Sequence, residues 1–490
     1  MLAKLLLLVF FFGTMIAVGV YSRKHATNVN SFVLGGRSVG PWLTAFAYGT
    51  SYFSAVVFIG YAGQFGWKYG LASSWIGIGN ALIGSLLPWL ILAKRTRSMT
   101  HHLGSTTMPD FFEKRFDSKN LKIAASAIAF IFLIPYTASV YNGLSKLFAM
   151  AFDIPFWTCV TGMAILTGVY VIVGGYMATA INDFIQGLIM LVGIVAVIAA
   201  VLANQGGFSE AVSKLGQITG EGIPAGSLSS LFGPDPLNLL GVVILTSLGT
   251  WGLPQMVHKF YTIKDEKSIR TGTIISTIFA LIISGGSYFL GGFGHLFDDP
   301  SLYTDGKIAY DGIVPLMLKT ALPDILIGIV IILVLSASMS TLSSLVLTSS
   351  STLTLDLIKG NLVKKMSDKT QLLTMRVLIV FFIILSVVLA LNPPTFIAQL
   401  MGISWGALAG AFLAPFLFGL YWKGVTRAAV WTSFLSGVGI TVSNMFFGYI
   451  SSPINAGAIA MIAGLVLVPI VSLITPKLER SKLDKIFQQQ

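Results

Sequence analysis

Charged residues are scarce in this chain of 490 residues: Asp, Glu, Lys and Arg make up 10% of it, against 55% hydrophobic residues. Soluble globular proteins carry about 25% charged residues, so this composition excludes an ordinary soluble protein. The apolar runs are continuous and about 20 residues long, as bilayer-spanning helices require. A transmembrane β-barrel would show shorter segments of alternating polarity. We therefore predict an all-α polytopic membrane protein.

Residues that build metal or catalytic sites are also few. A single cysteine, Cys159, excludes an intramolecular disulfide and a cysteine metal cluster. The five histidines are scattered apart from His101 and His102, and the sequence has no GxxxxGK[ST] motif for ATP. Without a catalytic set of side chains at membrane depth, we predict that the chain is not an enzyme.

Thirteen apolar spans can be counted in the sequence. They are 2–21, 41–65, 73–92, 123–149, 156–173, 184–202, 239–257, 271–293, 325–355, 373–391, 396–421, 428–450 and 457–474. Most of the 31 Lys and Arg residues fall in alternate loops, and basic loops of membrane proteins face the cytoplasm. We therefore expect a multi-pass protein of the cell membrane, plasma or inner, with its N-terminus outside and its C-terminus cytoplasmic.

Two spans contain small and polar residues that would interrupt a helix. The first is 48–54 (YGTSYFS), and the second is 247–255 (SLGTWGLPQ). Broken helices at matching places in two halves indicate a transporter site within an inverted repeat, although small residues also serve helix packing. We predict one transmembrane domain over 1–490, with a first repeat at 41–202 (spans 2–6) and a second at 239–421 (spans 7–11). Extra helices at 422–474 and a cytoplasmic tail at 475–490 would follow.

The ninth span is dense in hydroxyl groups. Ser336, Ser340, Ser343 and Ser344 share one helical face. Neutral oxygens of this kind can bind sodium, although they also form hydrogen bonds between membrane helices. Asp183 abuts the core of span 6, where an acid is a functional candidate or, alternatively, a helix N-cap.

Together, three stretches resemble the sodium:solute symporter family, which includes sodium/proline, sodium/pantothenate, sodium/sialic acid and sodium/glucose carriers. They are GGRSVG at 35–40, GGYMATAINDFIQG at 174–187 and ASMSTLSS at 337–344. The resemblance implies a leucine-transporter-like fold and sodium as the coupling ion. It also implies a main sodium site formed by Thr50, Phe53, Ala337, Ser340 and Thr341. A second sodium site, present in some members, would fall on Asp183, Ser340, Ser343 and Ser344.

The solute is predicted from the resemblance and from polar or aromatic residues within spans. Proline carriers usually have an aspartate where this chain has Tyr52, and several segments look closer to pantothenate and monocarboxylate carriers. We expect a half-helix N-terminus to bind the carboxylate, since we find no membrane-embedded Arg or Lys to pair with it. The candidate solute-binding residues, which could equally be structural, are Ser51, Tyr52, Tyr136, Thr250, Trp251, Gln399 and Trp405.

These features predict a sodium-coupled importer of a small carboxylate-bearing solute, working by alternating access. Its partners would be sodium, the solute and the lipid bilayer, with no nucleic acid and no obligatory protein partner. The alternatives are a symporter for proline or another amino acid and, in a different class, a membrane sensor derived from a transporter.

Overall fold

The computed structural model describes residues 2–152, 155–359, 362–363 and 365–488, and α-helices dominate it. The helices are α1 (Leu2–Ser22), α2 (Val29–Leu34), α3 (Pro41–Tyr52), α4 (Ala62–Tyr69), α5 (Ser74–Ala81), α6 (Leu87–His102), α7 (Met108–Phe116), α8 (Lys119–Phe152), α9 (Phe156–Asn204), α10 (Phe208–Gln217), α11 (Pro236–Leu248), α12 (Pro254–Tyr261), α13 (Glu266–Gly291), α14 (Tyr310–Ala321), α15 (Asp324–Thr352), α16 (Asp368–Leu391), α17 (Ile397–Tyr421), α18 (Arg427–Phe447), α19 (Pro453–Ile474) and α20 (Arg480–Phe487). A short antiparallel hairpin joins β1 (Tyr303–Thr304) to β2 (Lys307–Ile308).

Ten helical segments of the described chain are long and apolar enough to cross a membrane. Two of them, Val56–His102 and Phe156–Asn204, have 47 and 49 residues, more than twice the length that one crossing needs. Each therefore accounts for parts of two predicted spans, and α1 is a further apolar helix. All thirteen predicted spans lie on helices of the structure.

The longest helix, α9, bends where the sequence predicts the boundary between spans 5 and 6. Gly175 has φ +57° and ψ −151°, a conformation that is essentially restricted to glycine. A Cβ at this position would lie 2.8 Å from the Phe32 ring. The bend thus needs a glycine both for its backbone and for its contact with α2.

Both predicted helix interruptions are confirmed. In span 2, α3 ends at Tyr52, Phe53 is extended, and the chain resumes as a π-helical turn (Val56–Tyr61) before α4. In span 7, α11 is followed by a 3₁₀ turn (Gly249–Trp251), and α12 then begins at Pro254. Proline suits this first helical position because it has no N–H to leave unpaired. Both breaks are buried, so their free backbone groups face the protein interior.

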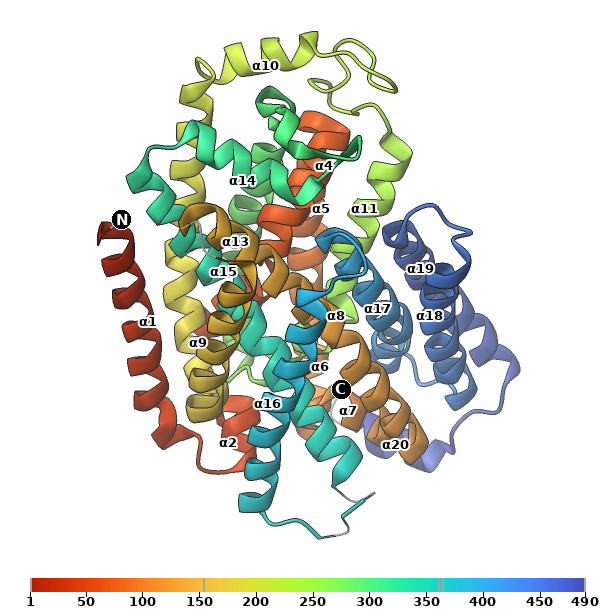
Figure 1. The fold of residues 1–490 in the computed structure, drawn as a ribbon. Helices are drawn as coiled ribbons and strands as arrows, with labels where there is room; N and C mark the ends of the chain where they lie inside the picture. Colours follow the sequence, from red (N-terminus) through yellow and green to blue (C-terminus); the bar gives the residue numbers. More distant parts are fainter. Residues whose placement is uncertain (1, 153–154, 360–361, 364, 489–490) are drawn as a thin grey trace.

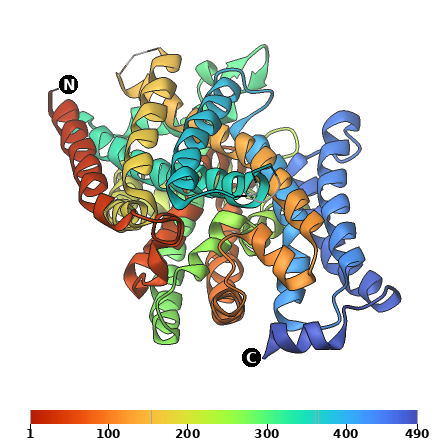
Figure 2. The same ribbon diagram turned by 90° about the horizontal axis from the view of Figure 1, so that it is seen from below.

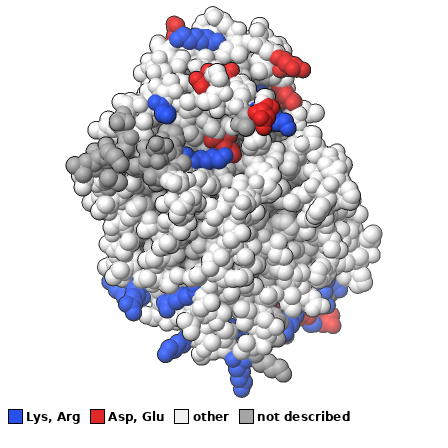
Figure 3. All heavy atoms as spheres, in the orientation of Figure 1, with Lys and Arg blue, Asp and Glu red and all other residues white. Residues whose placement is uncertain are grey.

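The helices form one bundle, with α1 at one edge and α18 and α19 at the opposite edge (Figures 1 and 2). In Figure 1, α10 and α14 cover the upper end, whereas α2, α7 and α20 lie toward the lower end. On the face shown in Figure 3, Lys and Arg gather at the lower end, and most Asp and Glu lie at the upper end. A band free of charged side chains separates the two ends on that face, as a membrane-embedded surface requires.

Candidate ion and solute site

The break in span 2 faces the hydroxyl-rich part of α15. The Ser340 hydroxyl donates hydrogen bonds to the carbonyl oxygens of Thr50 (3.0 Å) and Ala337 (3.1 Å). The Thr341 hydroxyl donates to the same two oxygens at 3.2 and 3.1 Å. The Thr50 carbonyl is accessible to α15 because α3 ends two residues later, which leaves its last carbonyls without partners in the helix. Four of the five residues predicted for the main sodium site therefore meet in one buried group.

The fifth predicted residue, Phe53, lies beside this group. Phe53 and Ala337 both line a cavity of about 10 Å³ between the span-2 break and α15. A cavity of that size has room for about one water molecule. Thr50, Ser340 and Thr341 do not line this cavity, and most of the side chains that do line it are apolar.

Asp183 is fully buried on α9, well beyond the Gly175 bend. It therefore lies inside the helix, and the alternative interpretation of Asp183 as an N-cap is wrong. Neither carboxylate oxygen has a hydrogen-bond partner among the described residues. Its Oδ2 atom lies 3.8 Å from Nζ of Lys259, which is itself buried.

Lys259 is the residue of this region that the sequence analysis missed. We expected no Lys or Arg within the membrane, and this expectation was wrong: only 2% of the Lys259 side chain is exposed. The predicted span 7 ends at residue 257, which leaves Lys259 outside the apolar run. The structure instead continues the span as α12, which turns Lys259 inward. The sequence signal for it is Pro254: proline favours the first position of a helix, and the helix that begins there contains Lys259.

The hydroxyls predicted for a second sodium site have other partners. Lys259 Nζ donates to Ser344 Oγ at 2.9 Å, and Ser344 Oγ lies 2.8 Å from Ser51 Oγ. The Ser343 hydroxyl donates to the Ser340 carbonyl in its own helix at 2.9 Å. A hydrogen-bonded chain therefore runs from Lys259 through Ser344 to Ser51, in the span-2 break.

Aromatic residues from three parts of the chain meet next to both breaks. The ring of Tyr52 stacks on Trp405 at a centroid distance of 5.9 Å, and Tyr136 meets Trp405 edge-on at 5.8 Å. Trp405 also packs on Gly249 of span 7, where a Cβ would lie 2.4 Å from the indole. The Tyr136 hydroxyl and Trp405 Nε1 are buried without a hydrogen-bond partner in the described chain. Because buried polar groups are normally paired, these two atoms are suited to bind a ligand.

The other residues predicted to bind the solute lie differently. Thr250 Oγ1 donates to the Gly84 carbonyl (2.9 Å), and Trp251 Nε1 donates to the Ile83 carbonyl (2.8 Å). These bonds tie the span-7 break to span 3. Gln399 accepts a hydrogen bond from the Thr395 hydroxyl, beside the first turn of α17. The structure therefore groups Tyr52, Tyr136 and Trp405, and gives the remaining four side chains different partners, with Ser51 paired to Ser344.

The segments at the basic end of the molecule are joined to one another. Val39, before span 2, pairs with the chain after span 7: its N–H donates to the Thr262 carbonyl, and its carbonyl accepts from Lys264 N–H. Asp110 of α7 forms ion pairs with Lys114 (2.8 Å) and Lys122 (3.1 Å). Burial alone would raise the pKa of Asp110, but these two ammonium groups lower it below its ordinary value. Charged contacts as well as backbone hydrogen bonds therefore join the segments at the basic end of the molecule.

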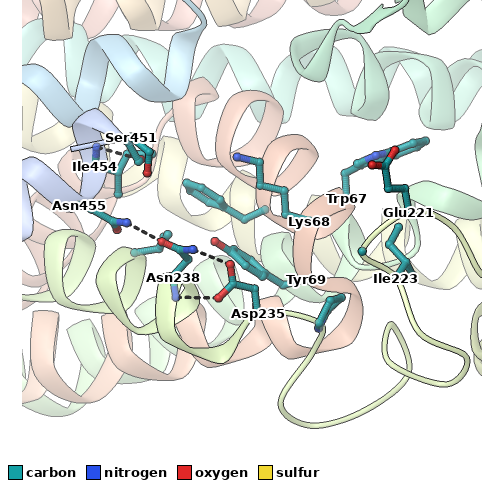
Figure 4. A pocket seen from close by; sticks show the side chains of 15 residues that line it. Trp67, Lys68, Tyr69, Glu221, Ile223, Asp235, Asn238, Ser451, Ile454 and Asn455 are labelled. Carbon is teal, nitrogen blue, oxygen red and sulfur yellow. Dashed lines mark hydrogen bonds between the residues drawn. The ribbon is translucent and has the colours of Figure 1, made fainter. Parts of the chain in front are cut away.

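A surface pocket of about 450 Å³ lies near the opposite end, between the end of α4, the start of α11 and the loop before α19 (Figure 4). Lys68 projects into it, and Asp235 accepts a hydrogen bond from the Asn238 side chain at its floor (Figure 4). Its lining includes none of the residues predicted to bind sodium or solute.

Comparison with known proteins agrees with this geometry. A model of the sodium:solute symporter family matches residues 32–437. The sodium/proline symporter of Staphylococcus aureus (strain JH9) is 30% identical over 489 residues, which cover 96% of this chain and 91% of the relative. The corresponding protein of strain COL matches equally well.

Solved structures share the fold. A Na+-coupled sialic acid symporter, in a substrate-bound outward-open state, matches with a TM-score of 0.76 at 19% identity, over 98% of this chain and 99% of that chain. MhsT in complex with L-phenylalanine matches with a TM-score of 0.57 at 16% identity, over 89% and 98%. The predicted all-α fold of the leucine-transporter type is confirmed. Sodium as the coupling ion is likewise confirmed.

Proposed function

This chain belongs to the sodium:solute symporter family, and we propose that it imports a small carboxylate-bearing solute of the pantothenate or monocarboxylate type. It is a multi-pass membrane transporter that couples a solute to sodium. Import would proceed by alternating access, driven by sodium entering from outside. The family and the fold are those of transporters rather than enzymes.

The sodium site that we propose consists of the carbonyls of Thr50, Phe53 and Ala337 with the hydroxyls of Ser340 and Thr341. The observation that carries it is the convergence of both hydroxyls on the open Thr50 carbonyl. Sodium prefers such uncharged oxygen ligands, and each hydroxyl could turn a lone pair toward the ion. Since these ligands belong to the region of the span-2 break and to α15, a bound ion would hold the broken span 2 against span 9. That would favour the conformation in which the solute binds.

The proposed solute site is the aromatic group of Tyr52, Tyr136 and Trp405 between the two breaks. Its rings suit an apolar body of modest size. The Tyr136 hydroxyl and the Trp405 indole N–H are donors without partners among the described residues, so they can bind a carboxylate. The proposal therefore needs no cation dedicated to the solute.

Proline is the second candidate, favoured by the relatives named sodium/proline symporter. The aromatic faces of Tyr52 and Trp405 could hold the charged amine of proline through cation–π attraction. Tyr52, however, supplies no negative charge at the position where proline carriers usually have an aspartate. A solute with a carboxylate and no amine is the better match for this site.

The test is uptake of labelled pantothenate, lactate, acetate and proline into proteoliposomes, with an inward sodium gradient and a potassium control. Sodium-dependent accumulation of pantothenate, lactate or acetate, with the protein as the only component, would support the proposal and exclude a sensor. Accumulation of proline alone would replace the proposed solute by the second candidate. Equal uptake in sodium and potassium would contradict the proposed sodium site.

Tyr136→Phe tests the solute site directly. The substitution keeps the ring but removes a hydroxyl that has no partner in the described chain, so the fold should be unaffected. We expect the KM for the solute to rise roughly 5- to 150-fold, the effect of losing about 1–3 kcal/mol. Tyr141→Phe is the matched control, because Tyr141 is buried on the same helix outside the aromatic group. Equal KM values for both variants and the wild type would remove Tyr136 from the site.

A further inference from the structure

The second sodium site implied by the resemblance contains a lysine side chain. The Lys259 ammonium lies 3.8 Å from Asp183 Oδ2 and donates to Ser344 Oγ at 2.9 Å. Asp183 and Ser344 are two of the four residues that would hold the second ion. The residues present therefore do not fit a second sodium ion while Lys259 remains in place.

The ammonium group can supply the positive charge that a sodium ion would bring to this site. It carries one positive charge, which balances the buried Asp183 carboxylate, and it uses a serine oxygen that would otherwise bind the ion. A sodium ion added between the same groups would meet a like charge at close range in a region of low dielectric constant. Lys259 and a second sodium ion therefore exclude each other.

Lys259 is also held firmly in this position. Its Nζ atom lies 5.2 Å from the centre of the Tyr176 ring, a cation–π contact. Its backbone carbonyl accepts a hydrogen bond from the Thr262 hydroxyl. Its side chain is 2% exposed, so water provides no competing environment for the charge.

We propose that Lys259 is a built-in cation that takes the place of the second sodium ion, so that this symporter binds one sodium ion per chain. The inference rests on the proposed function, because the single ion is the one assigned to Thr50, Phe53, Ala337, Ser340 and Thr341. Through Ser344, the ammonium also keeps Ser51 of span 2 linked to span 9. Lys259 thus determines the ion stoichiometry of transport.

The experiment counts bound sodium on the full-length protein in lipid nanodiscs, with radiolabelled sodium and no solute. We expect one ion per chain for the wild type. In Lys259→Gln the carboxylate of Asp183 loses its counter-charge, and we expect two ions per chain. Adding Asp183→Asn to that variant should return the count to one. Lys146→Gln is the matched control. Lys146 is a lysine paired with Asp311 of α14, and neither residue belongs to the main or the second sodium site, so this variant should leave the count at one.

Each result separates the inference from the proposed function. Two ions per wild-type chain would overturn the inference and leave the proposed sodium site standing. One ion per chain in a folded Lys259→Gln variant would also overturn it. No saturable binding by the wild type would overturn the proposed sodium site, and the inference with it. Thermal unfolding adds a second readout: sodium should raise the Tm of Lys259→Gln more than that of the wild type, and equal shifts would contradict the proposal.

Discussion

At the scale of single residues, the hydroxyl groups of α15 divide into two sets with different partners. Ser340 and Thr341 reach across to the Thr50 carbonyl of span 2. Ser338, on the same helix and equally buried, bonds only the Val334 carbonyl of its own helix among the described contacts. Hydroxyl density therefore marks the helix, whereas contact with the Thr50 carbonyl marks the two hydroxyls of the proposed ion site.

Ser340→Ala and Thr341→Ala should each raise the sodium concentration needed for half-maximal uptake. Loss of one oxygen ligand costs about 1–3 kcal/mol, or roughly 5- to 150-fold in affinity. Because coupling is reciprocal, the KM for the solute should rise most at low sodium. The measurement is initial uptake rate against sodium concentration in proteoliposomes.

Ser338→Ala is the control for these two variants, since it removes a buried hydroxyl from the same helix without touching span 2. Its sodium dependence should match that of the wild type. If all three variants behaved alike, the effect would belong to packing of α15, and the site assignment would fail.

At the scale of elements, the helix breaks position the candidate site. The break in span 2 frees the carbonyls that meet α15, and the break in span 7 brings Gly249 against Trp405. Small and polar residues predicted both breaks from the sequence. How α12 turns after the second break could not be predicted, because its direction depends on packing against neighbouring helices.

Gly175→Ala tests the bend of α9. The backbone there has φ +57°, and a Cβ would lie 2.8 Å from the Phe32 ring. We expect a loss of stability of about 1–3 kcal/mol, seen as a lower Tm in detergent or nanodiscs. Gly162→Ala is the control on the same helix, since a Cβ there meets nothing within 4 Å. Its Tm should be unchanged or slightly higher, as alanine favours helix by up to about 1 kcal/mol. Equal Tm values for Gly175→Ala and the wild type would show that the bend tolerates a side chain.

At the scale of the whole molecule, the uneven distribution of charge predicts the orientation in the membrane. Lys and Arg gather at the lower end in Figure 3, as expected of a cytoplasmic face. We therefore expect the N-terminus outside and the C-terminus inside. The repeats at 41–202 and 239–421 remain a prediction that follows from the fold.

Cysteines introduced one at a time test this orientation. The native cysteine, Cys159, is first replaced by alanine so that each variant has a single thiol. Glu221→Cys and Lys482→Cys place exposed thiols at the two ends. An impermeant maleimide should label the first in intact cells and the second only after permeabilisation. The reverse pattern would invert the orientation.

The sequence by itself determined the class and the spans of this protein, and it predicted most of the residues that meet at the proposed ion site. Bilayer thickness imposes long apolar runs, and residues that break or line a membrane helix are rare enough to stand out. Only the tertiary structure decided which side chains meet. It brought Lys259 to Asp183 and Ser344, and it collected Tyr52, Tyr136 and Trp405 from three distant helices. These contacts depend on how helices pack and turn, and packing joins residues whose separation along the chain gives no sign of their proximity.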